Sequence, residues 1–378
     1  MDDDEGETGM KRRSLLMLLL LAVVVTGGCG DVKQINRITF VTVLGIESAE
    51  KGVRVHALSA IPSRYASLAP SGGTLTGKGS PNFIMTAEGY TISDALYQLK
   101  RKSARDIQYG HTKVILFSGE LAKKGLSEQL DFLMRRDEIQ KIAWVAVTKG
   151  SPEHIIRAKA SVPESVGDWM VDVFSGAGSD TFEVLPIYLY QFYSGTLDPG
   201  ASPYSMVLSR SGEETALQTS EMALFGSDRL VGYIPSNDVK YVSLLQKRKL
   251  ASTTFTLEKE KLSFTLLNYK SQVQWKRDRM NVELLLKLDL DQTARLSIDS
   301  RAELLEIESK LSRQVEKELS SLIAKLQDMR SDPVGFGEVY RVAHGGKLDK
   351  KEWLTSIFPD QRVEVHVKTN IQRKGMIK

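Results

Sequence analysis

Cys29 is the residue of this chain whose type and surroundings most clearly indicate chemistry. It is the single cysteine, and it follows the basic cluster Lys11-Arg12-Arg13 and an apolar run from Leu15 to Val25. A basic region, an apolar stretch of about 7–15 residues and small residues at the exit are the parts of a secretory signal peptide. The thiol lies where the cleavage site should be, directly after Thr26-Gly27-Gly28. The arrangement predicts a bacterial lipoprotein, in which Cys29 takes a diacylglycerol, residues 1–28 are removed and the new amine is acylated.

Two alternatives to the lipoprotein remain open, an ordinary signal peptide with an incidental cysteine and an uncleaved signal anchor. Thr26 stands where Leu is commonest in a lipobox, and the acidic stretch Asp2-Asp3-Asp4-Glu5 precedes the basic cluster. The apolar run is shorter than the roughly 20 residues of a membrane-spanning helix. If Cys29 carries two or three acyl chains, each buried CH₂ contributes about 0.8 kcal/mol and the anchoring is lasting.

The other polar residues show no catalytic or metal-binding spacing. The five histidines are scattered without an H-E-x-x-H pattern, and His366 lies on the polar side of a predicted strand, which favours a solvated side chain. Gly335-Phe336-Gly337 lacks the third glycine of a dinucleotide-binding loop, so a tight turn after Pro333 is the simpler interpretation. We therefore expect no enzymatic activity, no metal site and no cofactor.

Composition and charge agree with a folded protein near a membrane. Apolar residues make up 42% and charged residues 26% of the chain, and the formal net charge is +4. Basic and acidic residues are interspersed, which suits the neighbourhood of anionic lipid but not a nucleic-acid partner.

The first half of the chain alternates predicted strands and helices. Thr91 and Asp94 form a capping-box pattern that opens a helix, and a second helix is expected from Leu121 to Arg135. This alternation predicts a mixed α/β domain. The expected strands cover residues 38–46, 53–57, 113–117 and 142–147.

The second half shows a change in composition and then clearer periodicities. Gly, Pro and Ser become frequent between Ser175 and Ser220, which marks a boundary, and two short strands are expected within 221–234. Alternating apolar residues predict a half-buried strand from Val282 to Leu290. Apolar residues at spacings of three, four or seven predict one long amphipathic helix from Arg301 to Arg330.

The predicted fold is α+β, with three mixed α/β domains after the signal peptide of residues 1–28. They are an N-terminal domain (29–205), a middle strand-rich domain (206–275) and a C-terminal domain (276–378). The last contains a strand, the long amphipathic helix and a closing C-terminal strand with Val363, Val365 and Val367.

Several blocks spread over nearly all of the mature chain carry a family resemblance. The most specific one is C-terminal, where the long helix is followed by Asp332-Pro333-Val334-Gly335-Phe336-Gly337, by Trp353 and by the closing strand. With the anchor cysteine these blocks resemble the Ger(x)C spore-germination lipoproteins, the C subunits of germinant receptors. The other blocks are Ile35-Asn36-Arg37 with Val43-Leu44-Gly45-Ile46, residues 110–116, residues 121–126, Arg135-Arg136-Asp137-Glu138-Ile139 with Trp144-Val145-Ala146, and Ala223-Leu224-Phe225 with Leu230-Val231-Gly232-Tyr233.

The resemblance implies a non-enzymatic ectodomain on the outer face of the cytoplasmic (inner spore) membrane. It implies membrane attachment through diacylglycerol and fatty acyl chains on Cys29, and partners in the integral-membrane A and B type germinant-receptor subunits. From a different functional class, a free-standing solute-binding lipoprotein of a transporter is the alternative. Such a protein should have two similar lobes around a ligand cleft, whereas the thirds of this sequence differ in character.

Overall fold

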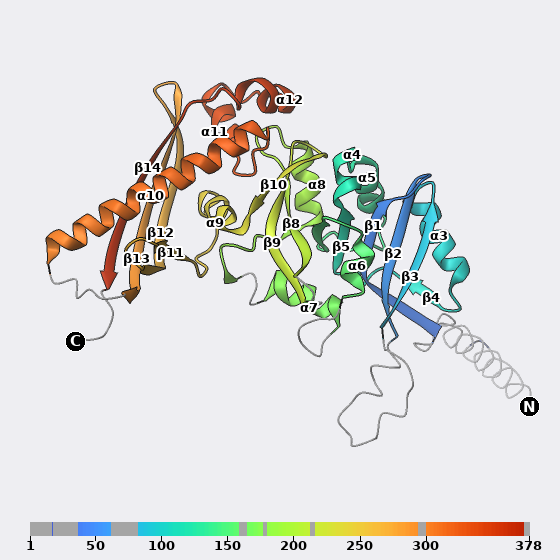
Figure 1. The fold of residues 1–378 in the computed structure, drawn as a ribbon. Helices are drawn as coiled ribbons and strands as arrows, with labels where there is room; N and C mark the ends of the chain where they lie inside the picture. The colour runs from blue at the N-terminus through green and yellow to red at the C-terminus, as the bar shows by residue number, and fades with distance from the viewer. Residues whose placement is uncertain are drawn as a thin grey trace, which may run out of the picture.

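A large mixed sheet forms the N-terminal end of the molecule and a smaller sheet forms the other end (Figure 1). The computed structural model describes residues 17, 37–61, 82–158, 165–176, 180–211, 216–293 and 300–373. Within these ranges no helix is both long enough and apolar enough to span a bilayer.

The large sheet has parallel strands at its centre and antiparallel strands on both sides. Its main path runs β10-β9-β8-β6-β5-β1-β2-β3, with β4 paired to β1 and β7 paired to β6. Strands β1, β5, β6 and β8 are mutually parallel, and every residue of β5 is buried, as expected for a central strand. The bounds are β1 (Ile38–Ser48), β2 (Val53–Ala60), β3 (Asn82–Gly89), β4 (Asp106–Gln108), β5 (Val114–Ser118), β6 (Trp144–Thr148), β7 (Ile187–Tyr188), β8 (Tyr204–Ser211), β9 (Ala216–Phe225) and β10 (Leu230–Pro235).

Helices cover both faces of the large sheet. Buried side chains of α3, α4, α5 and α8 share one apolar core with the sheet, and those of α6, α7 and α9 share another. The second core continues without interruption to the smaller sheet. The bounds are α3 (Ile92–Lys102), α4 (Gly119–Lys124), α5 (Ser127–Arg135), α6 (Pro152–Ile156), α7 (Val166–Ser175), α8 (Leu189–Leu197) and α9 (Ser236–Leu245).

Of the two helices predicted in the first half of the chain, the structure confirms one and corrects the other. Thr91 caps α3 as expected, since its hydroxyl accepts from the Asp94 backbone N–H at 3.2 Å. The single helix predicted from Leu121 to Arg135 is wrong, because the chain forms α4 and α5 with a break at Gly125. Gly125 has φ +114°, which a helix cannot contain.

The smaller sheet carries the clearest sequence periodicities. Its order is β11-β12-β13-β14, and α10 packs on one face. The five apolar residues predicted to alternate from Val282 to Leu290 are all buried in β13, and the long predicted helix is α10 with 28 residues. The bounds are β11 (Thr254–Leu257), β12 (Leu262–Lys276), β13 (Arg279–Thr293), α10 (Arg301–Asp328), α11 (Phe336–Ala343), α12 (Lys350–Glu352), a π-helical turn (Trp353–Ile357) and β14 (Val363–Arg373).

The fold is therefore mixed α/β with a C-terminal strand, long helix and closing strand, as the sequence predicts. The segment predicted as the middle domain, 206–275, supplies most of β8, all of β9 and β10 to the large sheet, and β11 and nearly all of β12 to the smaller sheet. The domain limits at 205 and 275 stay predictions.

Candidate functional site

Cys29, the predicted site of lipid attachment, lies outside the described residues. Its acylation and the cleavage before it therefore remain predictions. The described chain begins its continuous part at Arg37, directly before β1.

Asp332 is the centre of the C-terminal signature block, and its carboxylate is fully buried. Oδ1 accepts from the backbone N–H groups of Gly335 at 2.8 Å and Phe336 at 3.0 Å. Oδ2 accepts from the Gly337 N–H at 2.8 Å and from Trp353 Nε1 at 3.1 Å. Burial raises the pKa of Asp332 to about 6, against the opposing effect of these four hydrogen bonds.

The two glycines of the block fit this arrangement for different reasons. Gly335 lies in the tight turn predicted after Pro333 and has φ +88°, which glycine adopts at low cost. At Gly337 an added Cβ would lie 2.7 Å from Trp353 Nε1 and 2.8 Å from the Gly200 backbone. The signature residues, although spread over 332–353, therefore form one close-packed unit.

This unit joins the end of α10 to the large sheet. The Asp332 main chain exchanges two hydrogen bonds with Ser202, through the Ser202 N–H at 2.7 Å and the Ser202 hydroxyl at 3.1 Å. Ser331 donates its hydroxyl to the carbonyl of Phe225, the last residue of β9, at 2.7 Å. Glu338 donates its N–H to the Gly200 carbonyl at 3.1 Å. We call residues 331–338 together with 200–202 the signature joint.

Lys350 strengthens the same contact from α12. Its ammonium donates to the carbonyls of Gly195, Asp198 and Ala201, all in the segment that leads into β8. Burial lowers the pKa of Lys350 to about 8, although the charges of Asp198 and Asp332 oppose the shift. Sequence reasoning missed Lys350, because nothing in its local pattern separates it from the many exposed lysines.

Sequence reasoning also missed His56, a titratable side chain that is buried in the large sheet. His56 Nε2 lies 3.0 Å from Glu47 Oε1, and Nδ1 lies 3.0 Å from the Thr86 hydroxyl. Burial raises the pKa of Glu47, but hydrogen bonds with His56 and Ser151 outweigh it and leave the pKa lowered. The turn at residues 50–52 could have indicated this pair, because it places residue 47 on the face of the hairpin that His56 shares.

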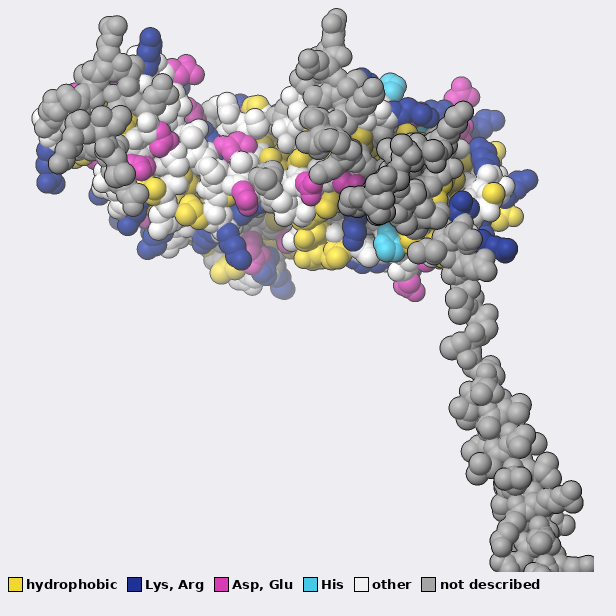
Figure 2. Space-filling view, turned by 90° about the horizontal axis from the view of Figure 1, so that it is seen from below, with side chains coloured by type: hydrophobic (Ala, Val, Ile, Leu, Met, Phe, Trp, Pro, Cys, Tyr) yellow, Lys and Arg dark blue, Asp and Glu magenta, His cyan; other side chains and the backbone are white. Residues whose placement is uncertain are grey.

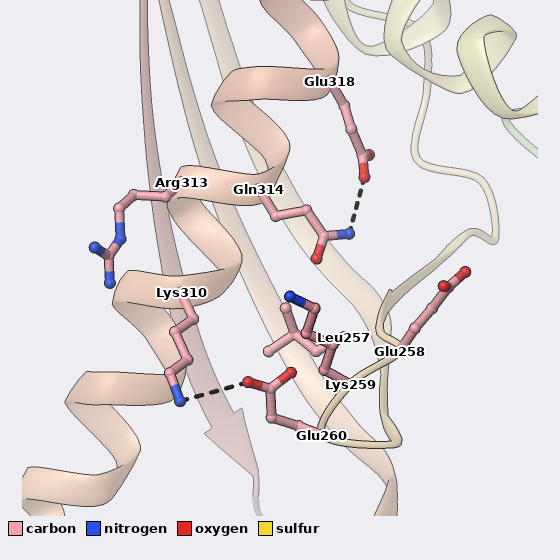
Figure 3. Close-up of a pocket in the computed structure, with 8 residues that line it drawn as sticks. All are labelled: Leu257, Glu258, Lys259, Glu260, Lys310, Arg313, Gln314 and Glu318. Carbon is pink, nitrogen blue, oxygen red and sulfur yellow. Dashed lines mark hydrogen bonds and ion pairs between the residues drawn. The ribbon is translucent and has the colours of Figure 1, made fainter.

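A polar groove of about 570 Å³ lies between α10 and the β11–β12 turn (Figure 3). Lys310 reaches across it to Glu260 at 3.4 Å, and Gln314 donates to Glu318 at 2.8 Å, while Arg313 points away. Tyr241 of α9 also donates its hydroxyl to Glu318. The carboxylates of Glu260 and Glu318 are therefore engaged by neighbouring side chains of the groove.

His111, His344 and His366 do not converge on a common centre. His366 is exposed on β14 as expected, His111 packs 4.3 Å from the Phe40 ring, and His344 stacks on Tyr340 at 3.8 Å. Across the described ranges, no group of three or more His, Cys, Asp or Glu side chains could hold a metal ion.

Comparisons with known proteins match both halves of the chain. Residues 31–210 match the family model described as "Spore germination protein N-terminal domain". Residues 220–375 match the one described as "Spore germination B3/ GerAC like, C-terminal".

Individual relatives agree over almost the whole length. YfkR of Bacillus subtilis (strain 168) is 22% identical over 371 residues, covering 93% of this chain and 94% of that protein. Spore germination protein GerQC of Bacillus cereus is 22% identical over 358 residues, covering 92% and 95%. The crystal structure of the GerBC protein has the same fold, with a TM-score of 0.54 at 15% identity, covering 87% of this chain and 96% of that one.

Proposed function

The chain belongs to the spore germination GerAC family, and we propose that it acts as the C subunit of a germinant receptor. In this proposal it has no enzymatic activity. It is held by acyl chains on Cys29 at the outer face of the inner spore membrane, where it docks on the integral-membrane A and B type subunits and supports germination.

The observation that carries the proposal is the match of both family models, 31–210 and 220–375, to the two halves of one chain. The first match begins two residues after Cys29 and the second ends three residues before Lys378. The family models therefore cover nearly all of the predicted mature chain. This coverage supports a role for the whole ectodomain.

The signature joint supports a scaffold function. The polar groups of the block that most resembles the family form hydrogen bonds within the protein: Asp332 bonds to Gly337, Trp353 and Ser202. A fixed connection between the two sheets lets the molecule present several surfaces to partners at constant spacing, as a docking subunit requires.

The solute-binding alternative finds no support in the fold. It calls for two similar α/β lobes around a cleft, whereas the described residues form one sheet of ten strands and one of four, with different helical cover.

Intact mass of the chain extracted from membranes tests the anchor. We expect the wild-type mass to equal residues 29–378 plus diacylglycerol, with or without an N-acyl chain, and we expect Cys29→Ala to keep residues 1–28 and carry no lipid. A wild-type chain that begins at an unmodified residue other than Cys29 would refute the lipoprotein. The Thr26→Leu variant, which restores the commonest lipobox residue, is the matched control and should be processed like the wild type.

Capture of the full-length chain from native spore membranes tests the receptor role. We expect the A and B type subunits to be recovered with it, and deletion of its gene to remove the response to at least one nutrient in a germination panel. Recovery of neither subunit, together with unchanged germination, would exclude the proposal.

A further inference from the structure

The parallel strands β1, β5 and β6 are neighbours in the large sheet, and all three begin at the same end of it. Helix α3 ends there too, because β4 follows it closely and pairs Asp106 with Ile38 at the start of β1. We call this end of the sheet, with the C-terminus of α3 and the residues directly before β5 and β6, the strand-start rim.

Exposed basic residues from several elements gather on this rim. Figure 2 views the molecule from below and shows Lys and Arg side chains around the end that carries β1 and α3. Acidic side chains are also present near the rim: Asp106 accepts from Gln108, Glu138 is paired with Arg136 at 3.0 Å, and Asp137 is exposed. The exposed basic side chains are Arg37, Lys100, Arg101, Lys102 and Lys113.

The helix dipole explains only part of this cluster. Three successive basic residues in the last turn of α3 suit the negative end of its dipole. Arg37 and Lys113 lie outside α3, directly before β1 and β5, so no helix terminus accounts for them. Arg37 and Lys113 lie on neighbouring strands about five residues apart in register, so together with the α3 residues they spread the positive charge over several elements.

An aromatic and apolar group lies along the same rim. Trp144 at the start of β6 stacks on Tyr188 at 3.8 Å, and Tyr188 stacks on Tyr190 at 5.9 Å. The Tyr190 N–H bonds the Lys141 carbonyl, which places Tyr190 beside Ile142. Ile142 is 59% exposed and Tyr190 42% exposed. Trp and Tyr side chains are enriched at the boundary between lipid and water.

We propose that the strand-start rim lies on an anionic lipid surface, with the basic residues against headgroup phosphates and the aromatic group at the interface. The inference takes one feature from the proposed function, namely the acyl anchor at Cys29. Cys29 precedes Ile38, the first residue of β1, by nine residues. At full extension such a segment reaches roughly 30 Å, so the anchor holds this end of the sheet close to the bilayer.

The opposite end of the molecule provides an internal comparison. The β12–β13 turn exposes Lys276 and Arg277, and Lys347 is exposed beyond α11. This end is also basic, but it belongs to the smaller sheet and lies far along the molecule from β1 (Figure 1). Charge alone therefore does not choose between the two ends, whereas the anchor and the aromatic group favour the rim.

The test uses the full-length chain in proteoliposomes made either of phosphatidylcholine alone or of phosphatidylcholine with phosphatidylglycerol. Amine-reactive labelling, read by mass spectrometry, reports the accessibility of each lysine. We expect Lys100 and Lys113 to react severalfold more slowly on the anionic vesicles, with Lys276 and Lys347 unchanged. High salt should remove the difference, because it screens exposed charges. Equal labelling of Lys100 and Lys113 on both compositions, or protection of Lys276 and Lys347 instead, would overturn the inference.

A pair of charge variants makes the test specific. Arg37→Gln with Arg101→Gln removes two rim charges and leaves both rim reporters. Each charge near an anionic surface changes the docking equilibrium constant about fivefold, so this variant should lower that constant roughly 25-fold. Arg277→Gln with Arg362→Gln removes two exposed charges at the other end and should label like the wild type. If the two variants behaved alike, the rim would not be the lipid-facing surface.

Intact mass separates this inference from the proposed function. A chain that carries lipid on Cys29 but shows no protection of Lys100 and Lys113 refutes the rim alone. A chain without lipid that still shows protection supports the rim and refutes the anchor.

Discussion

At the scale of single residues, Asp332 is the most constrained polar group of the signature block. Its carboxylate is removed from water and accepts four hydrogen bonds, three of them from the turn that begins three residues later. An Asn at this position would aim an amide NH₂ at N–H donors, so even an isosteric change breaks the arrangement.

The raised pKa of Asp332 predicts a pH dependence of stability. The pKa is about 6 in the folded protein and 3.8 ordinarily, so the folded form binds the proton more tightly. The contribution of this group is therefore fully present below about pH 4 and is lost as the pH rises through about 6, by about 3 kcal/mol. In chemical unfolding from pH 4 to 7.5, the stability of the wild type relative to Asp332→Asn should shrink over this range. The exposed Asp360→Asn should track the wild type, and an advantage that instead grows with pH would contradict the prediction.

Gly337 predicts a steric effect that can be compared within the chain. Gly337→Ala should lower the free energy of unfolding by roughly 1–3 kcal/mol, because its Cβ would collide with Trp353 and the Gly200 backbone. The matched control is Gly150→Ala, since no atom lies within 4 Å of a Cβ added there. Its stability should stay within about 0.5 kcal/mol of the wild type. Equal melting temperatures for the two variants would show that the joint tolerates a side chain.

The sequence predicts single residues where local geometry decides and misses them where distant segments meet. A positive φ in the Gly335-Phe336-Gly337 turn could be expected, because only glycine adopts it at low cost. Lys350 could not, because its three carbonyl partners lie about 150 residues earlier in the chain. The pair of His56 and Glu47 is intermediate in predictability, because the two residues are close in sequence but only the register of the β1–β2 hairpin brings their side chains together.

At the scale of elements, α10 closes the outer edge of β14 through a row of side chains. Glu308, Ser312 and Glu316 accept from the backbone N–H groups of Ile371, Thr369 and Val367 at 2.7, 3.1 and 2.9 Å. Four residues of a helix rise about 6 Å and two residues of a strand about 6.6 Å, so the two rows stay in step. An edge that is satisfied in this way resists pairing with another chain.

Removing one member of this row should open the edge locally. Glu308→Ala leaves the Ile371 N–H without its charged acceptor and should cost roughly 1.5–3 kcal/mol. Glu306→Ala, two positions earlier on α10, removes only an exposed pair with Lys310 and should change stability by less than about 0.5 kcal/mol. Amide hydrogen exchange at Ile371 should rise in the first variant alone. If exchange there stayed slow in Glu308→Ala, the carboxylate would not be what protects the edge.

Element prediction succeeds where the period is long and sustained. Both α10 and β13 are read correctly, because 28 helical residues and five alternating apolar side chains leave little ambiguity. The break between α4 and α5 is missed because the apolar pattern continues across it, and only the backbone of Gly125 ends the first helix. From the sequence alone, Glu308, Ser312 and Glu316 would be predicted to form an ordinary solvent-exposed face of the helix.

At the scale of the whole molecule, strand order joins segments that the sequence separates. Strand β8 pairs with β6 across an intervening stretch that contains α6, α7 and α8, so the large sheet extends beyond the first predicted domain. Composition marks a boundary between Ser175 and Ser220 because Gly and Pro are frequent there, but composition does not record which strands pair across it. The signature joint then fixes the smaller sheet and α10 to the end of β9.

The length of the segment between Cys29 and β1 should control assembly with membrane partners. In the proposed function, a tether at Cys29 raises the effective concentration of the ectodomain at the membrane, and this concentration falls roughly as the −3/2 power of linker length. Tripling the segment with a flexible Gly-Ser insert after Gly30 should therefore reduce recovery of the A and B type subunits about fivefold without abolishing it. The same insert between Gly345 and Gly346, in an exposed turn where no atom lies within 4 Å of a Cβ added at Gly345, should leave recovery unchanged. Recovery that is unaffected by the insert after Gly30, or an unlipidated chain that assembles fully, would show that partner contacts alone hold the complex together.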